Sequence, residues 1–368
     1  MIWLVVPALA ATAYWLLVII AAARWRKAQP DATAALPAVS ILKPVRGRDP
    51  HFYEAIRSHA LQNYPQYEIL FGIADSADPA AADIRRLNAE FPARDIRLVV
   101  THTHMPNGKV GVLADLAEEA RYPLLLVNDS DIAVAPDYLR TVTAALDQPR
   151  AGLVTCLYRA ESENWPGRWE ALGVATEFAP SVLVARMLGS VEFALGSTML
   201  LRAEDLRRIG GFAAIGDYLA DDYQLGRRIH DLGLRVVFAP MVVATHLDAE
   251  TWSGAWRHQL RWSRAIRVSR PGGYFGYLVT HATFWALIAL AAGAWRVALA
   301  ALAIRMLGGI AVGWGVLRDR AAVARAWIIP FRDLWGFAIW VVGLRGNTVE
   351  WRGRRMRLDP NGRILTDL

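Results

Sequence analysis

Two aspartates stand one residue apart after an apolar run near the middle of the chain. The run is PLLLV at 123–127, and Asn128, Asp129, Ser130 and Asp131 follow it. Because side chains at positions i and i+2 point the same way off a strand, Asp129 and Asp131 can aim at one cation. Hard cations such as Mg2+ and Mn2+ bind carboxylate oxygens and often share their coordination with substrate phosphates. A loop with a solvated acidic turn is the alternative, and it is the commoner origin of an isolated Asp-x-Asp.

A second acidic site is GDYLADDY at 216–223, which precedes the helix-like stretch QLGRRIHDLG. Asp221 as N-cap and Asp222 in the first turn would both stabilise a helix start. A carboxylate near a metal-bound leaving group could also act as a general base and take a proton from an attacking hydroxyl. The residues alone leave both interpretations of Asp222 open.

A basic stretch, WRHQLRWSR at 256–264, is the third site. On a helix, Arg257, Arg261 and Arg264 share one face at i, i+4 and i+7. Such a face could hold a diphosphate leaving group. It could also lie on anionic lipid headgroups, and the two interpretations are compatible because apolar segments follow within a few residues.

Lys109 opens a helix-like segment after Asn107 and Gly108. A lysine at a helix start is mildly unfavourable to the helix dipole, which suggests a ligand phosphate or base nearby; a solvated lysine is the alternative. His102 and His104 lack the further spaced ligands that a zinc site requires. The single cysteine, Cys156, has an apolar context typical of a small buried side chain, and no disulfide can form within the chain.

Strand-like and helix-like segments alternate around these residues. Helices of this length between strands imply crossover connections and a largely parallel sheet. Ligands bind such sheets at the carboxyl ends of the strands, and Asp75 and Asp129 both fall at such ends. The strand-like segments are 39–42, 67–73, 96–100 and 124–127, and the helix-like segments are 52–61, 80–90 and 109–119.

Apolar segments flank this α/β region on both sides. Residues 1–24 predict a transmembrane helix, since 2–23 carry no charge and are long enough to cross a bilayer. A cleaved signal peptide is disfavoured because the positive charge follows the apolar run. The remaining expected segments are a linker at 25–37, a domain at 38–270, two spans within 274–317 (274–294 and 297–317), an interfacial or re-entrant helix at 326–344 and a basic tail at 345–368.

The helix at 326–344 is not predicted to span because Pro330, Arg332 and Asp333 interrupt it. Hydrophobic residues make up 54% of the chain and charged residues 20%, a composition typical of a membrane protein with a water-facing part. The net charge of +7 does not indicate a nucleic-acid partner, because basic clusters adjoin the apolar segments and no nucleic-acid motif is present. Arginines following residue 23 place the N-terminus outside and the main domain in the cytoplasm.

Taken together, the motifs resemble those of the ceramide glucosyltransferase family and its bacterial relatives, which include hopanoid-biosynthesis-associated glycosyltransferases. The resemblance extends over nearly the whole chain and implies a nucleotide-diphospho-sugar transferase domain of the GT-A type, with transmembrane helices at both ends. The motifs that carry it are KPVRGRDP at 43–50, GIADSADPA around Asp75, NGK at 107–109, NDSDI at 128–132, LGSTMLLR at 195–202, IGGF at 209–212, LADDY at 219–223 and RHQLRWSR at 257–264.

The resemblance implies a role for individual residues. Asp75 would contact the uracil or ribose side of a UDP-sugar, with Lys109 also on the nucleotide-sugar side. Asp129 and Asp131 would hold a divalent metal, Mn2+ or Mg2+, on its diphosphate. Asp222 would be the catalytic base.

The remaining implied roles concern acceptor or diphosphate contacts. Asp221, which stands where relatives carry Glu or Asp, is one of these. Arg261 and Trp262 match the Arg-Trp of the family's (Gln/Arg)-x-x-Arg-Trp signature and would belong with the nucleotide-sugar contacts. The chain departs from the pattern at the first signature position, where His258 stands with Arg257 and Gln259 beside it. Arg264 belongs to the same set of possible contacts. After NGK, Gly111 and Val112 replace the paired asparagines of the animal enzymes, which puts contacts of this helix in doubt.

The implied reaction is a single displacement with inversion, from a UDP-sugar, most simply UDP-glucose, to the primary hydroxyl of a ceramide-type lipid. Transfer of N-acetylglucosamine or another sugar to a hopanoid polyol is the alternative. A polysaccharide synthase is disfavoured because so few spans would not form a polymer channel. A non-catalytic binding module would not need a metal pair together with a base. The implied location is the bacterial inner membrane, as a multi-pass protein with the catalytic domain in the cytoplasm.

Overall fold

The computed structural model describes residues 2–25, 36–247, 251–351 and 353–367. The chain folds into two compact units, each assembled from separate segments. The sheet unit comprises Lys27–Tyr158 and Val191–His246, and the helical unit comprises Met1–Arg26, Arg159–Ser190 and Leu247–Leu368. Most of the expected linker at 25–37 lies outside the described residues.

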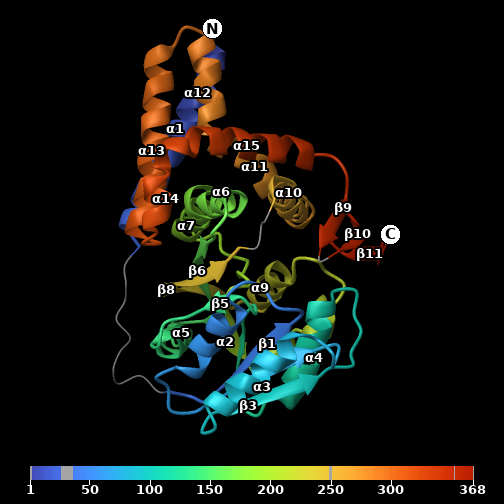
Figure 1. Ribbon diagram of the computed structural model, residues 1–368. Helices are drawn as coiled ribbons and strands as arrows, with labels where there is room; N and C mark the ends of the chain where they lie inside the picture. Colours follow the sequence, from blue (N-terminus) through green and yellow to red (C-terminus); the bar gives the residue numbers. More distant parts are fainter. Residues whose placement is uncertain (1, 26–35, 248–250, 352, 368) are drawn as a thin grey trace. The chain divides into compact units, whose positions relative to one another are not determined.

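The sheet unit contains strands in the order β3-β2-β1-β4-β7-β6-β8-β5; Figure 1 labels β1, β3, β5, β6 and β8 of this sheet. β1, β2, β3 and β4 run parallel, as the sequence predicts. β7 is antiparallel to both β4 and β6, and β5 is antiparallel to β8, so the sheet is mixed. The strands are β1 (Val39–Val45), β2 (Tyr67–Ile73), β3 (Asp95–Val100), β4 (Leu124–Val127), β5 (Ile132–Ala133), β6 (Ala151–Glu161), β7 (Met199–Arg202) and β8 (Arg235–His246).

Alternate residues of the parallel strands enter two hydrophobic cores, one on each face of the sheet, because successive strand side chains point to opposite faces. Ile41 and Ile69 lie in the core that holds the buried residues of α2 (Phe52–Ala60), α3 (Ala80–Glu90) and α5 (Tyr138–Leu146). Leu42 and Leu70 lie in the other core, with α4 (Gly108–Glu119), α8 (Ala203–Arg208), the short helix η2 (Phe212–Ile215) and α9 (Asp221–Asp231). These helices fix the loops at the carboxyl ends of the strands.

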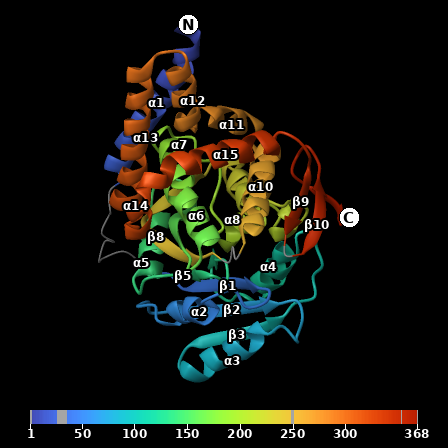
Figure 2. The same cartoon turned by 45° about the horizontal axis from the view of Figure 1, so that its top comes forward.

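The helical unit contains apolar helices that pack against one another (Figure 2). Its helices are α1 (Ile2–Ala23), α6 (Trp165–Gly173), η1 (Val174–Phe178), α7 (Ala179–Met187), α10 (Trp252–Ser269), α11 (Pro271–Gly276), η3 (Tyr277–Thr280), α12 (Ala282–Ala291), α13 (Trp295–Gly315), α14 (Arg320–Ala324), η4 (Ala326–Ile328) and α15 (Ile329–Gly343). The sequence predicts one domain over 38–270, but 159–190 and 247–270 cluster with this unit, because α7 and η1 pack on α1 and α13.

Among the described residues, three helical stretches are long and apolar enough to cross a membrane: Trp3–Ala23, Trp295–Gly315 and Ala326–Gly343. The span predicted at 274–294 is not a straight helix, because Pro271–Thr280 and Ala282–Ala291 meet at an angle of 52°. Pro330 stands in the first turn of α15, where its missing N–H is tolerated, so it does not interrupt that helix.

α1 and α13 run in the same direction. Ala8 packs in one cluster with Ala298 and Ala301, and seven residues further along α1 the Trp15 ring lies under the Arg305 guanidinium at 3.9 Å. The ends of the two helices at Ala23 and Gly315 are therefore on the same side.

The predicted basic tail contains strands in its described residues. It forms an antiparallel sheet of β9 (Thr348–Trp351), β10 (Arg354–Leu358) and β11 (Ile364–Asp367). α10 packs against β9 within the helical unit.

Candidate active site

The loop after β4 is fixed by the buried side chain of Asn128. Its Nδ2 donates a hydrogen bond to the carbonyl of Ser197 at 2.5 Å, and its Oδ1 accepts one from Lys43 Nζ at 2.5 Å. Lys43 Nζ also donates to the carbonyl of Asp129 at 3.0 Å. The Asp129–Asp131 segment therefore starts from a backbone that is held by Lys43 of β1 and by Ser197, which precedes β7.

Lys43 is a site residue to which the sequence assigned no role. Burial lowers the pKa of Lys43 to about 7, and the charges of Asp131 and Asp129 act in the opposite direction. The neighbouring His59 ring is also buried, and burial holds its pKa well below the usual value. One feature of the sequence could have indicated this role. Lys43, the first residue of KPVRGRDP, falls within an apolar strand, where a lysine without a partner is unusual.

Lys109 connects the two acidic motifs. Its Nζ lies 2.8 Å from Asp129 Oδ1 and 3.0 Å from Asp221 Oδ2. Burial acts to lower the pKa of Lys109, but the charges of Asp129 and Asp221 outweigh it and raise the pKa. Lys109 is therefore paired with two carboxylates of the chain, whereas the sequence suggested a ligand phosphate or base, or a solvated lysine.

Asn107 holds Lys109 and the second acidic motif together. The Asn107 side chain caps α4 by accepting a hydrogen bond from the Lys109 N–H at 3.1 Å. Its Nδ2 donates to the carbonyl of Tyr218 at 2.8 Å. The Asn107 side chain thus links residues 107–109 to residues 216–223.

Asp222 lies at the start of α9, next to this cluster. Its Oδ2 accepts a hydrogen bond from the Gly196 N–H at 3.2 Å, and its Oδ1 accepts one from the Tyr223 N–H at 2.7 Å. Burial and the charge of Asp221 raise the pKa of Asp222 to about 6, against the lowering effect of Lys109. A carboxylate with such a pKa can accept a proton near neutral pH.

Asp221 is not the N-cap of α9. The helix begins at Asp221 itself, the preceding Ala220 occupies the cap position, and no side chain caps the helix. The Asp221 carboxylate is instead paired with Lys109. The N-cap interpretation of Asp221 is therefore wrong. Its carboxylate is attracted by Lys109, which is distant in the sequence, so a local sequence pattern does not indicate this pair.

Asp131 accepts a hydrogen bond from the hydroxyl of Thr245 on β8. Burial and the charge of Asp129 raise the pKa of Asp131 to about 6. A nearby cation would offset the effect of the Asp129 charge on Asp131. Within the described ranges, no group of three His, Cys, Asp or Glu side chains could enclose a metal ion. A divalent metal at Asp129 and Asp131 would therefore need further ligands from a substrate diphosphate or from water.

Gly196 has no side chain, and this leaves space for the carboxylate of Asp129. A Cβ at this position would lie 2.9 Å from Asp129 Oδ2 and 3.6 Å from Lys109 Nζ. The same residue donates its N–H to Asp222. Gly196 therefore allows the backbone to approach both acidic motifs, and the sequence had singled it out only as part of LGSTMLLR.

Asp75 is exposed at the end of β2, where its Oδ1 accepts a hydrogen bond from the Ala77 N–H at 2.9 Å. β2 and β4 flank β1 and run parallel to it, so Asp75 and Asp129 follow strand ends at the same edge of the sheet. Among the described residues, no hydrogen bond or ion pair joins Asp75 to Lys43 or Lys109.

The basic residues of the third motif all lie on α10, in the helical unit. Arg264 donates a hydrogen bond to the carbonyl of Thr348, and the Arg261 guanidinium lies 5.9 Å from the centre of the Trp351 ring. Arg257 Nε is 3.8 Å from a carboxylate oxygen of Glu350. This face of α10 is therefore used in part to hold β9, a role that the basic-helix interpretation did not include.

The candidates for the first signature position have different contacts. Gln259 is buried, and its Oε1 accepts hydrogen bonds from Arg332 at 3.0 Å and from Trp335 at 2.9 Å. His258 Nδ1 is hydrogen-bonded to Glu170, and its ring lies 4.5 Å from that of Trp262. His258 and Trp262 are thus neighbours on one helix, while Gln259 serves the packing of α15.

The chain matches known glycosyltransferases over most of its length. The profile described as glycosyl transferase family 21 matches residues 3–364. Ceramide glucosyltransferase 3 of Caenorhabditis elegans is 31% identical over 205 residues, which are 55% of this chain and 44% of that protein. Ceramide glucosyltransferase 1 of the same organism is 28% identical over 216 residues, 58% of this chain and 46% of that protein. The matched region is thus less than half the length of these curated relatives.

A solved structure supports the fold. The mannosyltransferase PcManGT from Pyrobaculum calidifontis, in complex with GDP-Man and Mn2+, superposes with a TM-score of 0.56 at 22% identity, covering 93% of this chain and 99% of that one. The GT-A type of domain predicted from the motifs is therefore confirmed, and so is the predicted ceramide glucosyltransferase family.

Proposed function

The chain belongs to glycosyl transferase family 21, and we propose that it moves a sugar, glucose in the simplest case, from a UDP-sugar to the primary hydroxyl of a ceramide-type membrane lipid. The observation that carries this proposal is the gathering of Asp129 and Asp221 around Lys109, with Asp222 beside them, at the carboxyl ends of parallel strands. The ceramide glucosyltransferases that the chain resembles support a lipid acceptor.

The donor half of the proposal assigns the metal and nucleotide contacts. Asp129 and Asp131 hold Mn2+ or Mg2+ together with the diphosphate oxygens, and Lys109 adds a positive charge beside them. When bound, such a cation neutralises charge on the leaving diphosphate. Asp75 binds the uracil or ribose part, and Arg261 and Trp262 contribute further donor contacts. His258, Arg257, Asp221 and Arg264 remain candidates for acceptor or diphosphate contacts.

The acceptor half of the proposal assigns the base. Asp222 takes the proton of the lipid hydroxyl as that oxygen attacks the anomeric carbon from the face opposite UDP. The Gly196 and Tyr223 N–H groups hold its carboxylate in place. One displacement with one base inverts the configuration of the sugar.

The proposed location is the inner membrane of a bacterium, with the sheet unit in the cytoplasm. Arg24, Arg26 and Lys27 follow α1, while Arg318, Arg320 and Arg325 follow α13. Because α1 and α13 run in the same direction, these charges belong to one side of the membrane, and cytoplasmic flanks are the ones enriched in Lys and Arg. Arg296 lies in the first turn of α13, at the opposite end of that helix.

The test uses the full-length protein in detergent with Mn2+ or Mg2+. UDP-glucose and UDP-N-acetylglucosamine are each offered with ceramide and with a hopanoid polyol, and lipid products are identified by mass. Hexosyl-ceramide is the expected product. A sugar-modified hopanoid without a ceramide product would replace the acceptor in the proposal, and binding of UDP without any lipid product would contradict it.

A further inference from the structure

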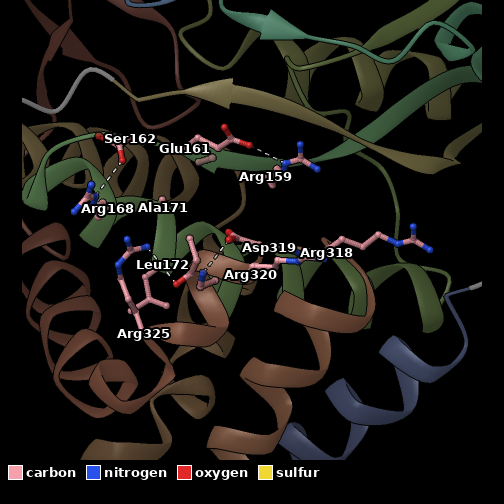
Figure 3. Close-up of a pocket in the computed structure, with 13 residues that line it drawn as sticks. Arg159, Glu161, Ser162, Arg168, Ala171, Leu172, Arg318, Asp319, Arg320 and Arg325 are labelled. Carbon is pink, nitrogen blue, oxygen red and sulfur yellow. Dashed lines mark hydrogen bonds and ion pairs between the residues drawn. The ribbon is translucent and has the colours of Figure 1, made fainter.

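A cavity of about 420 Å³ lies within the helical unit (Figure 3). Its lining comes from three stretches of chain: the end of β6, helix α6, and the loop after α13 with α14. The floor includes the buried side chains of Ala171, Leu172 and Ala322. None of these stretches contributes a residue to the site proposed for glycosyl transfer.

Arginines dominate the wall of this cavity. They are Arg159, Arg168, Arg318, Arg320 and Arg325. Arg159 is paired with Glu161 at 3.0 Å. Among the described residues, no carboxylate lies within ion-pair distance of the other four, and the hydrogen bonds of Arg168 and Arg325 go to backbone carbonyls at 3.3 and 3.2 Å.

The other acidic residue in the lining, Asp319, uses its carboxylate to accept a backbone hydrogen bond. Asp319 is buried, and its Oδ1 accepts a hydrogen bond from the Ala322 N–H at 2.8 Å. The Asp319 N–H donates to the carbonyl of Gly313 at 2.8 Å. Asp319 therefore fixes the loop that carries Arg318 and Arg320, and the preceding residue, Arg318, adopts a left-handed backbone with φ of 55°.

The position along the chain indicates the kind of ligand. α13 is long and apolar enough to cross a membrane, and the cavity adjoins the segment directly after its end at Gly315. Charge at the end of a span lies at the depth of lipid headgroups, and basic pockets beside transmembrane helices attract anionic headgroups. Guanidinium groups bind phosphate oxygens through paired hydrogen bonds.

We propose that this cavity binds the phosphate of an anionic phospholipid headgroup, with Arg168, Arg320 and Arg325 as its cationic contacts. The apolar floor faces the glycerol end of the same lipid. Arg318 extends away from the other labelled side chains in Figure 3 and is not part of the assignment. The lipid in this site is not the sugar acceptor, so the inference does not depend on the acceptor identity.

The test measures lipid bound to the full-length protein in detergent by native mass spectrometry. Phosphatidylglycerol, phosphatidylcholine and inorganic phosphate are titrated separately and in competition. The wild-type protein is expected to retain phosphatidylglycerol over phosphatidylcholine. The Arg320→Gln, Arg325→Gln double variant is expected to lose at least about fivefold in phosphatidylglycerol affinity.

Two further variants keep the result interpretable. Arg168→Gln, on α6, should reproduce the loss from a different part of the cavity wall. Arg296→Gln, at the other end of α13, is the matched control and should leave retention unchanged. The thermal midpoint in detergent verifies that each variant is folded.

Three results would overturn the inference. The first is equal retention of the two phospholipids by the wild-type protein. The second is undiminished phosphatidylglycerol binding by both cavity variants when they are folded. The third is displacement of phosphatidylglycerol by millimolar inorganic phosphate, which would identify a site for free phosphate instead of a lipid site.

Discussion

The helical unit buries Arg305 against Asp333, whereas the sheet unit gathers four aspartates beside two lysines. Arg305 Nε lies 2.9 and 3.0 Å from the two Asp333 oxygens, and the Thr283 hydroxyl donates to Asp333 Oδ2 at 2.8 Å. This pair is balanced by its own protein partners. Charged residues within a membrane helix require such partners because lipid offers none.

The acidic cluster of the sheet unit, Asp129, Asp131, Asp221 and Asp222, is not balanced in this way. The four aspartates outnumber the two nearby cationic side chains, Lys43 and Lys109. Burial and the charge of a neighbouring aspartate raise the pKa values of Asp131 and Asp222 to about 6. Perturbed carboxylates in a group are typical of functional sites. The comparison suggests that one charge cluster stabilises the fold and that the other requires a ligand to complete it.

The largest effect on the acidic cluster is expected from Asp222→Asn. Loss of the general base should lower kcat by about 10²- to 10⁴-fold, while UDP-glucose binding is retained because the amide keeps the shape of the side chain. Turnover and UDP-glucose binding are measured on the same preparation. Asp217→Asn, at an exposed position in the same motif, is the control. Near-normal turnover by Asp222→Asn would remove Asp222 from the catalytic role.

Breaking the balanced pair should affect stability instead of chemistry. Asp333→Ala leaves Arg305 buried without its partner, which is expected to cost about 3–5 kcal/mol. The double change Arg305→Met with Asp333→Leu should be much less destabilising, because it removes both charges. Thermal unfolding in detergent compares the two. An equal loss of stability in the single and double variants would contradict the role assigned to the pair.

The parts of the sheet unit that a local pattern encodes were predicted well. The segments 67–73, 80–90 and 124–127 coincide with β2, α3 and β4, because apolar periodicity and flanking polar residues are local signals. The antiparallel strands β7 and β8 carry no comparable local signal of their partners. Their pairing depends on residues far away in the sequence, as with Thr245 of β8, which contacts Asp131.

The sequence identified the residues of the candidate site, but it did not predict which of them contact one another. The motifs NGK, NDSDI and LADDY are visible in the sequence, while the Lys109 bridge between Asp129 and Asp221 is a tertiary contact. The use of Arg264 to hold β9 is likewise a tertiary contact that the basic residues of the tail do not indicate. The sequence predicts that Arg332 and Asp333 interrupt a helix, but each has a partner on another helix.

The pH dependence of kcat/KM tests whether the charges of the acidic cluster set the ionisation of Asp222. Since a base must be ionised to act and burial raises the pKa of Asp222 to about 6, kcat/KM should fall about tenfold per pH unit below that value. Lys109→Met removes a charge that lowers this pKa, so the acidic limb should move to higher pH. Lys109→Arg keeps the charge and is the control. An acidic limb that stays in place in Lys109→Met would show that Lys109 does not set the ionisation of the base.

Gly196→Ala should produce the smallest effect of the series. The added methyl group would lie 2.9 Å from Asp129 Oδ2 and must displace that carboxylate. A fall of about tenfold in kcat/KM is expected from the misplaced charge. Gly272→Ala, where nothing lies within 4 Å of the new Cβ, is the control. Unchanged kinetics in Gly196→Ala would mean that the position of Asp129 is not critical.

The most direct measurement of whether a ligand completes the acidic cluster is calorimetric titration of UDP-glucose into the full-length protein, with and without Mn2+. Mn2+ is expected to tighten UDP-glucose binding by about tenfold or more in the wild-type protein, because Asp129 and Asp131 share the cation with the diphosphate. Asp131→Asn should lose most of this gain while still binding UDP-glucose weakly. An affinity for UDP-glucose that is the same with and without Mn2+ in both proteins would contradict the assignment of the acidic cluster as a metal and diphosphate site.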